Sequence, residues 1–351
     1  MKIAIATIID NDNYGNRLQN YAAQQMLSKK NNAVYTLKNN PLKNNKLFFI
    51  IRNIRYYKRK IKIETKRNIN FSKFNELINF HKKEINAFSL HRTNFDYYIV
   101  GSDQVWNPKI GRLKDFDLLV GVPTKKRISL SASFGIEKIP KKYINKTQNE
   151  LKKFKAISVR EDRGKEIVEE LTGRKDIKVL VDPTMLLTAE EWDEVSKKPA
   201  MLKNDKFILN YFLGEISEER KKEIERVAKE NDCEIINILD KNSPFYECGP
   251  SEFLYLEKNA FLICTDSFHS SVFAILYNRP FVIFDREQKN VTSMNSRLDT
   301  LINKFKLKNR KFEGKITEKN LKHNYEEAYK ILEKERQKSE RFLKEALDIK
   351  E

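Results

Sequence analysis

The sequence predicts an α/β protein made of two doubly wound domains with a cleft between them. Two observations support this fold class. Short apolar runs alternate with amphipathic helical patterns along almost the whole chain, which is typical of parallel strands joined by helices. The chain also has 351 residues, of which 40% are hydrophobic, so it is long and apolar enough for two separate cores.

Each strand is expected where an apolar run is bounded by turn residues or by a helical pattern. The predicted strands are 2–9, 33–37, 97–101, 127–134, 156–160, 178–182, 207–213, 234–239, 261–265 and 280–284. Helical patterns lie between many of them, for example at 16–30, 164–173 and 217–232. This order predicts parallel sheets flanked by helices.

The domain boundary is expected near 190–204. The stretch 181–205 contains two prolines and many charges but no strand pattern, and a fresh strand begins directly after it. We therefore expect domains at 1–190 and 204–317. The remaining residues, 318–351, show apolar side chains at helical spacing and predict a helical segment that packs back on the body.

The N-terminus, the lengths of the apolar runs and the cysteines indicate the compartment in which the protein is expected. The N-terminus runs straight into a strand pattern without the features of a signal peptide, and no apolar run approaches the ~20 residues needed to span a bilayer. We expect a cytoplasmic protein. The three cysteines lack CxxC spacing, so neither a disulfide framework nor a metal site is expected.

The net charge of +19 is concentrated in one segment, residues 43–67, which has ten Lys and Arg against one Glu. Aromatic and aliphatic residues are interleaved with these charges. One interpretation is a basic surface helix with a loop. The other is an interfacial segment that contacts anionic lipid at the inner membrane face, or a lipid-diphosphate substrate. Nucleic acid is not expected as a partner, because no recognition motif accompanies the segment.

Ligands of open parallel sheets bind at the carboxyl ends of strands, so polar residues that follow strands are candidate site residues. The strand at 261–265 is followed by "DSFHSS", which contains one of only four histidines. If a helix begins near Phe268 with Ser267 as its N-cap, its free N–H groups form an anion site. His269 would then lie in the first turn, where a bound anion favours the imidazolium, a proton donor. The alternative is a capped helix with an exposed histidine.

A second group of candidates follows the strand at 97–101. Ser102, Asp103 and Gln104 offer three hydrogen-bonding side chains, which suits a ligand with several hydroxyls. Trp106 could stack on a sugar ring or pack in the core. The alternative for the whole group is an ordinary helix cap.

Two arginines also follow strands. Arg160 could bind a phosphate or carboxylate in a bidentate manner, or form a salt bridge within its own charged run. Arg17 lies at a helix start, where a cation opposes the helix dipole and needs an anion or an acidic partner. No GxGxxG pattern accompanies it, so a dinucleotide site is not supported.

Several of these stretches occur together in a recognisable order. They are "NYGNRLQNYA", "GSDQVWNP", "ASFG", "SVREDRG", "VDPTMLL", "TDSFHSSVFAI" and "NSRLDTLINKFKL". In this set the chain resembles the polysaccharide pyruvyl transferase family from residue 3 to about 307. The family usually has glycine after the histidine, where this chain has Ser270. A side chain thus stands where a backbone could approach a ligand closely.

The resemblance implies two Rossmann-like domains facing a central cleft, as in GT-B glycosyltransferases, with the acceptor on the first domain and the donor on the second. It implies phosphoenolpyruvate as donor, with no cofactor or metal, and a pair of glycan hydroxyls as acceptor, on a polysaccharide or its polyprenyl-diphosphate-linked precursor. On this basis we expect catalytic roles for His269 as acid and for Asp103, or else Asp266, as base. The expected donor ligands are Arg160, Ser267, Ser270, Ser271 and Arg297, and the expected acceptor ligands are Asn13, Arg17, Ser102, Gln104 and Trp106.

Two other functions fit the same sequence. The first is a GT-B-type glycosyltransferase that uses a nucleotide sugar. The second is a non-catalytic protein that binds a membrane surface or nucleic acid through the basic segment 43–67, with steeply salt-dependent binding.

Overall fold

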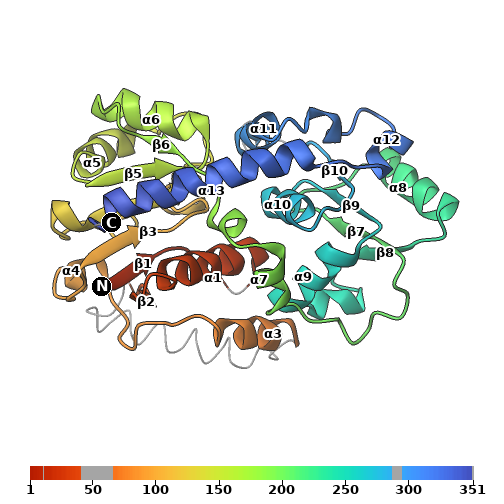
Figure 1. Ribbon diagram of the computed structural model, residues 1–351, viewed down its shortest axis with the longest axis horizontal. Coiled ribbons are helices and arrows are strands. Elements are labelled where there is room, and N and C mark those ends of the chain that lie inside the picture. Colours follow the sequence, from red (N-terminus) through yellow and green to blue (C-terminus); the bar gives the residue numbers. More distant parts are fainter. Residues whose placement is uncertain (11, 41–65, 287–294, 350–351) are drawn as a thin grey trace. The chain divides into compact units, whose positions relative to one another are not determined.

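The computed structural model describes residues 1–10, 12–40, 66–286 and 295–349, which form two compact units (Figure 1). Unit 1 comprises Met1–Leu186 and Gln337–Glu351, and unit 2 comprises Leu187–Arg336. The basic segment 43–67 lies outside the described residues except for its last two residues, which begin a helix.

Unit 1 contains a six-stranded sheet in the order β2-β1-β3-β4-β5-β6. Its strands are β1 (Lys2–Ala6), β2 (Ala33–Thr36), β3 (Tyr97–Val100), β4 (Arg127–Ala132), β5 (Ala156–Val159) and β6 (Lys178–Val179). All neighbouring strands are parallel. The order reverses between β1 and β3, which is the topological switch point at which such sheets bind ligands.

Both faces of this sheet are buried, because alternate residues of each strand enter different clusters. Ile3 and Ile5 of β1 join a cluster with residues of α1 and with the last turns of the C-terminal helix. Ala4 and Ala6 join the cluster that contains residues of α5 and α6. The helices of this unit are α1 (Tyr14–Ser28), α3 (Lys66–Asn75), α4 (Ala87–Leu90), α5 (Lys141–Leu151) and α6 (Asp162–Thr172), with 3₁₀ turns η1 (Pro108–Ile110), η2 (Thr124–Lys126) and η3 (Pro183–Leu186).

Unit 2 contains a four-stranded parallel sheet in the order β10-β9-β7-β8. Its strands are β7 (Phe207–Tyr211), β8 (Glu234–Asn237), β9 (Leu262–Thr265) and β10 (Phe281–Ile283). Its helical elements are α7 (Ala189–Asp193), α8 (Glu218–Glu230), η4 (Pro244–Glu247), α9 (Pro250–Asn259), α10 (Phe268–Leu276), α11 (Asn295–Lys304), η5 (Lys308–Arg310), α12 (Glu318–Leu321) and α13 (Glu326–Ala346), the last of which ends in unit 1. The switch point here lies between β7 and β9.

The ten predicted strands all form, and the doubly wound α/β class is confirmed in both units. Several strands end earlier than predicted, because polar residues at their carboxyl ends turn away to form side-chain hydrogen bonds. Thr7, which follows β1, donates from its hydroxyl to Ser102 O. Ser133, which follows β4, donates to the Glu161 carboxylate.

The division between the units falls at Leu186, ahead of the expected 190–204. The reason is that residues after Leu186 already pack on unit 2: Trp192 lies edge-to-face on Phe273, and Asp193 pairs with Lys258. The segment 318–351 is also divided between the units. None of the helices among the described residues is long and apolar enough to cross a membrane.

Candidate functional site

The carboxyl ends of β7 and β9 meet at the Asp266 carboxylate. Asp266 directly follows β9, and its two oxygens accept hydrogen bonds from Leu213 N at 2.7 Å and Gly214 N at 2.8 Å. Both donors belong to the loop after β7. Arg286, which follows β10, completes the arrangement with a 2.9 Å ion pair from Nε. Asp266 therefore holds three strand ends of unit 2 together.

Gly214 is required at this junction for steric reasons. A Cβ on Gly214 would lie 2.6 Å from Cγ of Arg286 and 3.1 Å from the Asp266 carboxylate. Close approach of the loop backbone to the ion pair therefore depends on a residue without a side chain. Asp266 accepts hydrogen bonds from both loop amides and from Arg286, so this carboxylate positions the loop after β7 and the Arg286 side chain.

His269 lies in the first turn of α10, next to the Asp266 junction. Its side chain is 7% exposed, and its ring lies edge-on to Phe268 at 5.3 Å. The sequence expectation of a helix start is confirmed, with Ser267 at the N-cap. The Ser267 side chain makes no capping hydrogen bond among the described residues. The N–H groups of the first turn of α10 are therefore not capped by Ser267. Ser271 instead donates from its hydroxyl back to Ser267 O.

Ser270, which stands in place of the usual family glycine, faces the interior of unit 2. It is fully buried near the carboxyl group of Glu257 on α9, although neither its Oγ nor either Glu257 oxygen has a hydrogen-bond partner among the described residues. Burial raises the pKa of Glu257 well above its usual range, and the Ser270 hydroxyl only partly opposes this. The extra side chain at 270 therefore lies between two helices and does not occupy the outer surface of the α10 start.

The strand ends of unit 1 carry a buried network of charges. Arg160 lies at the end of β5, with ion pairs to Asp182 at 2.6 Å and to Asp103 at 3.3 Å. The Asp182 carboxylate also accepts hydrogen bonds from Ser102 and Thr184. Burial acts to lower the pKa of Arg160, but the carboxylates of Asp182 and Asp103 outweigh it and raise that pKa.

Arg160 is thus a salt-bridge residue, although its partners lie outside its own charged run. Arg163, in the same charged run, pairs with Glu166 and Glu170, which lie further along α6. Glu161, the residue after Arg160, is 1% exposed and accepts three hydrogen bonds from Ser133 Oγ, Phe134 N and Gly135 N.

The remaining acceptor candidates of this edge are engaged in local structure. Gln104 accepts a hydrogen bond from the Asn107 side chain at 2.5 Å. Trp106 is fully buried between Phe134 and Phe154, and its indole nitrogen donates to Asp117 O. Of the two interpretations of Trp106, the geometry supports core packing, since no ring face is left for a sugar.

Asn13 and Arg17 flank the start of α1. Asn13 is the N-cap, and its side chain accepts from Asn16 N. Arg17 is fully buried and donates to Ile8 O at 2.5 Å and to Asn75 Oδ1 at 3.3 Å. Burial lowers the pKa of Arg17 to about 10, opposed by the charge of Asp10. The Arg17 guanidinium opposes the dipole of α1 and is stabilised by hydrogen bonds to a backbone oxygen and an amide oxygen.

Arg297, the last predicted donor ligand, lies in the first turn of α11 and is 7% exposed. Three other residues at strand ends were missed by the sequence interpretation. Asp182 follows β6, Arg286 follows β10, and Asn210 is the penultimate residue of β7. The rule that polar residues follow strands could have found the first two. Asn210 carried no signal, because it sits inside an otherwise apolar run.

Together the two parallel sheets, each with a switch point at its carboxyl edge, define the GT-B-like class of α/β proteins. The fold resembles that of a Rickettsia africae glycosyltransferase, with a TM-score of 0.51, 10% identity and coverage of 99% of each chain. It also resembles a candidate UDP-N-acetylglucosamine 2-epimerase from Listeria monocytogenes, with a TM-score of 0.53, 10% identity and coverage of 96% of this chain and 89% of that chain. At this identity the likeness concerns the fold alone.

The family is shown by the sequence. The family model of polysaccharide pyruvyl transferases matches residues 13–288, most of the chain. No similar sequence was found among the curated proteins. The chain belongs to the polysaccharide pyruvyl transferase family.

Proposed function

We propose that this protein transfers the pyruvyl group of phosphoenolpyruvate to a hydroxyl pair of a glycan, forming a cyclic pyruvate ketal. The observation that carries the proposal is the position of His269, in the first turn of α10 at the carboxyl edge of β9, in a chain of this family. The glycan is a polysaccharide or its lipid-linked precursor. The predicted contact of segment 43–67 with anionic lipid favours the lipid-linked precursor.

The start of α10 has the chemistry that a small anion needs. Its first-turn N–H groups and the positive end of its dipole attract phosphate or carboxylate. Ser267 and Ser271 add hydroxyls at this turn. We propose Arg297, in the first turn of α11, as a cation that assists donor binding in this unit.

The reaction follows from a protonated His269 beside the bound anion. The imidazolium gives its proton to the methylene carbon of the enol phosphate, and positive charge develops at the neighbouring carbon. A sugar hydroxyl attacks that carbon and loses its proton. A second hydroxyl then displaces phosphate, which leaves with the remaining proton, and the ketal closes. General acid catalysis of this kind contributes about 10²–10⁴-fold to the rate. Asp103 stays the predicted base.

The test is the substitution His269→Gln, which keeps an amide donor but removes the transferable proton. We expect pyruvyl transfer to fall by about 10²-fold or more, while calorimetry still detects binding of phosphoenolpyruvate. His81→Gln, in unit 1, is the matched control. An active His269→Gln enzyme would contradict the proposal.

Donor identity is tested separately by thermal unfolding with phosphoenolpyruvate, UDP and CMP, since a ligand raises the midpoint by mass action. We expect stabilisation by phosphoenolpyruvate alone. Stabilisation by UDP or CMP without an effect of phosphoenolpyruvate would instead indicate a nucleotide-sugar glycosyltransferase.

A further inference from the structure

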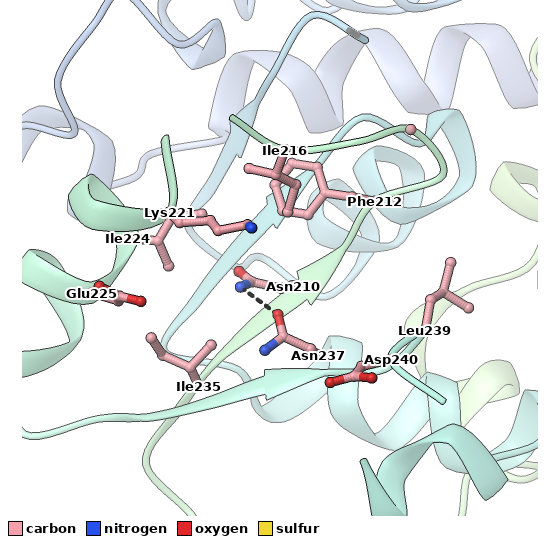
Figure 2. Close-up of a pocket in the computed structure, with 11 residues that line it drawn as sticks. Asn210, Phe212, Ile216, Lys221, Ile224, Glu225, Ile235, Asn237, Leu239 and Asp240 are labelled. Atoms are coloured by element: carbon pink, nitrogen blue, oxygen red, sulfur yellow. Dashed lines mark hydrogen bonds between the residues drawn. The ribbon is translucent and has the colours of Figure 1, made fainter. Parts of the chain in front are cut away.

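Unit 2 holds a second feature at its sheet edge, a cavity on the β8 side of β7. It has a volume of about 410 Å³ and lies between the carboxyl ends of β7 and β8 and the helix α8 (Figure 2). That volume is within the range of ~300–1,000 Å³ typical of small-molecule sites. His269 and Asp266 do not line it, since they follow β9 on the other side of β7.

The floor of the cavity is a pair of asparagines in register on neighbouring strands. Asn210 donates from Nδ2 to Asn237 Oδ1 at 2.9 Å, as Figure 2 shows. Asn210 is 7% exposed, and its Oδ1 accepts no hydrogen bond from any described residue. An unsatisfied buried acceptor destabilises the structure, so a ligand hydroxyl that donates to it would recover that lost energy. Asn237 is exposed, and its amide can donate to the same hydroxyl.

The charges of the lining disfavour an anionic ligand. Among the described residues that line the cavity, Lys221 is the one cation, against the two carboxylates of Glu225 and Asp240. The Lys221 amine is already paired with Glu218 at 2.6 Å. The helix α8 also begins with two glutamates, Glu218 and Glu219, which offset the positive end of its dipole. A phosphate in this cavity would therefore meet mostly negative charge.

The walls are apolar and suit the C–H faces of a ring. They are formed by Phe212, Ile216, Ile224, Ile235 and Leu239. The Phe212 ring is held edge-to-face by Phe284 at 5.3 Å. The Lys221 side chain is half exposed and reaches over the asparagine pair in Figure 2, so it can move aside when a ligand reaches the shielded Asn210 oxygen.

We propose that this cavity binds a neutral pyranose, with its hydroxyls on Asn210, Asn237 and Asp240 and its carbon face on the apolar walls. Asp240 accepts one hydrogen bond at Oδ1 from Asn242 N, so its other oxygen is available to a second hydroxyl. The binding of the sugar is independent of the proposed reaction. That the sugar is a unit of the acceptor glycan rests on the proposed function.

The experiment is saturation-transfer NMR on the full chain with methyl glycosides of glucose, galactose and mannose, and with N-acetylglucosamine. Uridine, UMP and phosphoenolpyruvate are the charged and nucleoside comparisons. Ile216→Trp fills the cavity and Asn237→Ala removes the exposed amide. The matched controls in the same unit are Met201→Trp and Asn204→Ala, which lie outside the cavity.

We expect saturation transfer to at least one neutral sugar, with the dissociation constant raised about tenfold or more, equivalent to about 1.4 kcal/mol, by Ile216→Trp and by Asn237→Ala. Both control variants should bind as the parent does, and circular dichroism should show that all four fold. The proposal is overturned if no sugar receives saturation, if Ile216→Trp leaves saturation transfer to the sugar unchanged, or if uridine or UMP displaces the sugar. Pyruvyl transfer is assayed separately, so sugar binding without transfer would reject the proposed function alone.

Discussion

At the carboxyl edge of the six-stranded sheet, the charged side chains form buried ion pairs with one another. Arg160 pairs with Asp182 and Asp103, and each is at most 6% exposed. At the carboxyl edge of the four-stranded sheet, Asp266 and Arg286 form the only such pair among the described residues, and a cavity with a buried, unsatisfied amide oxygen lies beside them.

The two edges share their strand order around the switch point, so topology alone does not explain the difference. What differs is the pairing of charged side chains at the strand ends and the cavity beside the second edge, since buried polar atoms without a hydrogen bond from a described residue occur in both units, for example Glu161 Oε2 and Asn210 Oδ1. A compensated network stabilises one arrangement of the loops, whereas uncompensated groups gain energy when a ligand binds. We therefore expect substitution of Arg160 to act mainly on stability, and substitutions in the lining of the unit 2 cavity to act mainly on ligand binding.

The largest expected effect is that of Arg160→Met. Removing this guanidinium leaves two carboxylates buried near each other, which costs about 3–5 kcal/mol in the free energy of unfolding. The check is urea unfolding, with Arg163→Met as the control, because the surface ion pairs of Arg163 contribute only ~0–1 kcal/mol. If Arg160→Met keeps its stability but loses affinity for phosphoenolpyruvate, Arg160 binds the donor as the sequence suggested.

A matched pair of glycines comes next. A Cβ on Gly101, after β3, would lie 2.8 Å from both Cβ and Oγ1 of the buried Thr7. We expect Gly101→Ala to lower the free energy of unfolding by about 1–3 kcal/mol. Gly214→Ala meets Cγ of Arg286, whose ion-paired side chain must shift, whereas Thr7 is fixed at a strand end, so we expect a smaller loss of stability than for Gly101→Ala. Thermal unfolding of both variants decides this, and a greater loss for Gly214→Ala would reverse the comparison.

The smallest expected effect is a difference in sign between the substitutions of two buried glutamates, Glu161 and Glu257. Glu161 accepts three hydrogen bonds, so Glu161→Gln should lower the free energy of unfolding by about 1–2 kcal/mol. The pKa of Glu257 is raised by burial, so the opposite sign is expected for Glu257→Gln near neutral pH.

The sign follows from proton binding. Above an unfolded-state pKa of ~4.3 the unfolded chain loses the Glu257 proton while the folded chain keeps it, so the free energy of unfolding falls as pH rises toward the folded pKa. Glu257→Gln lacks this loss. Urea unfolding between about pH 5 and pH 7 should therefore show a shallower decline for the variant, and parallel curves would contradict the assignment.

Most of the fold could be predicted from sequence, because apolar runs between helical patterns define parallel strands. All ten strands formed, with ends such as Thr7 and Ser133 lost to side-chain hydrogen bonds that a propensity pattern does not contain. The start of α10 at Phe268 was also predicted, since Ser267 carries a local capping signal.

The partners of the candidate residues could not be predicted. The pairing of Arg160 with Asp182 joins residues 22 positions apart, and Asp266 accepts from a loop 52 and 53 positions away. Such contacts depend on strand order and register. Glu257 looked like an ordinary polar helix residue, and its burial against Ser270 follows from the packing of α9 on α10.

The most direct test of the account follows the proton from His269. The enzyme would be incubated in D₂O with phosphoenolpyruvate labelled with ¹³C at its second carbon and a glycan acceptor, and the product analysed by NMR and mass spectrometry. We predict a labelled ketal carbon bonded to two sugar oxygens and a methyl group with one deuterium, absent with His269→Gln. A product that keeps the enol methylene, or an undiminished ketal yield from His269→Gln, would contradict the account.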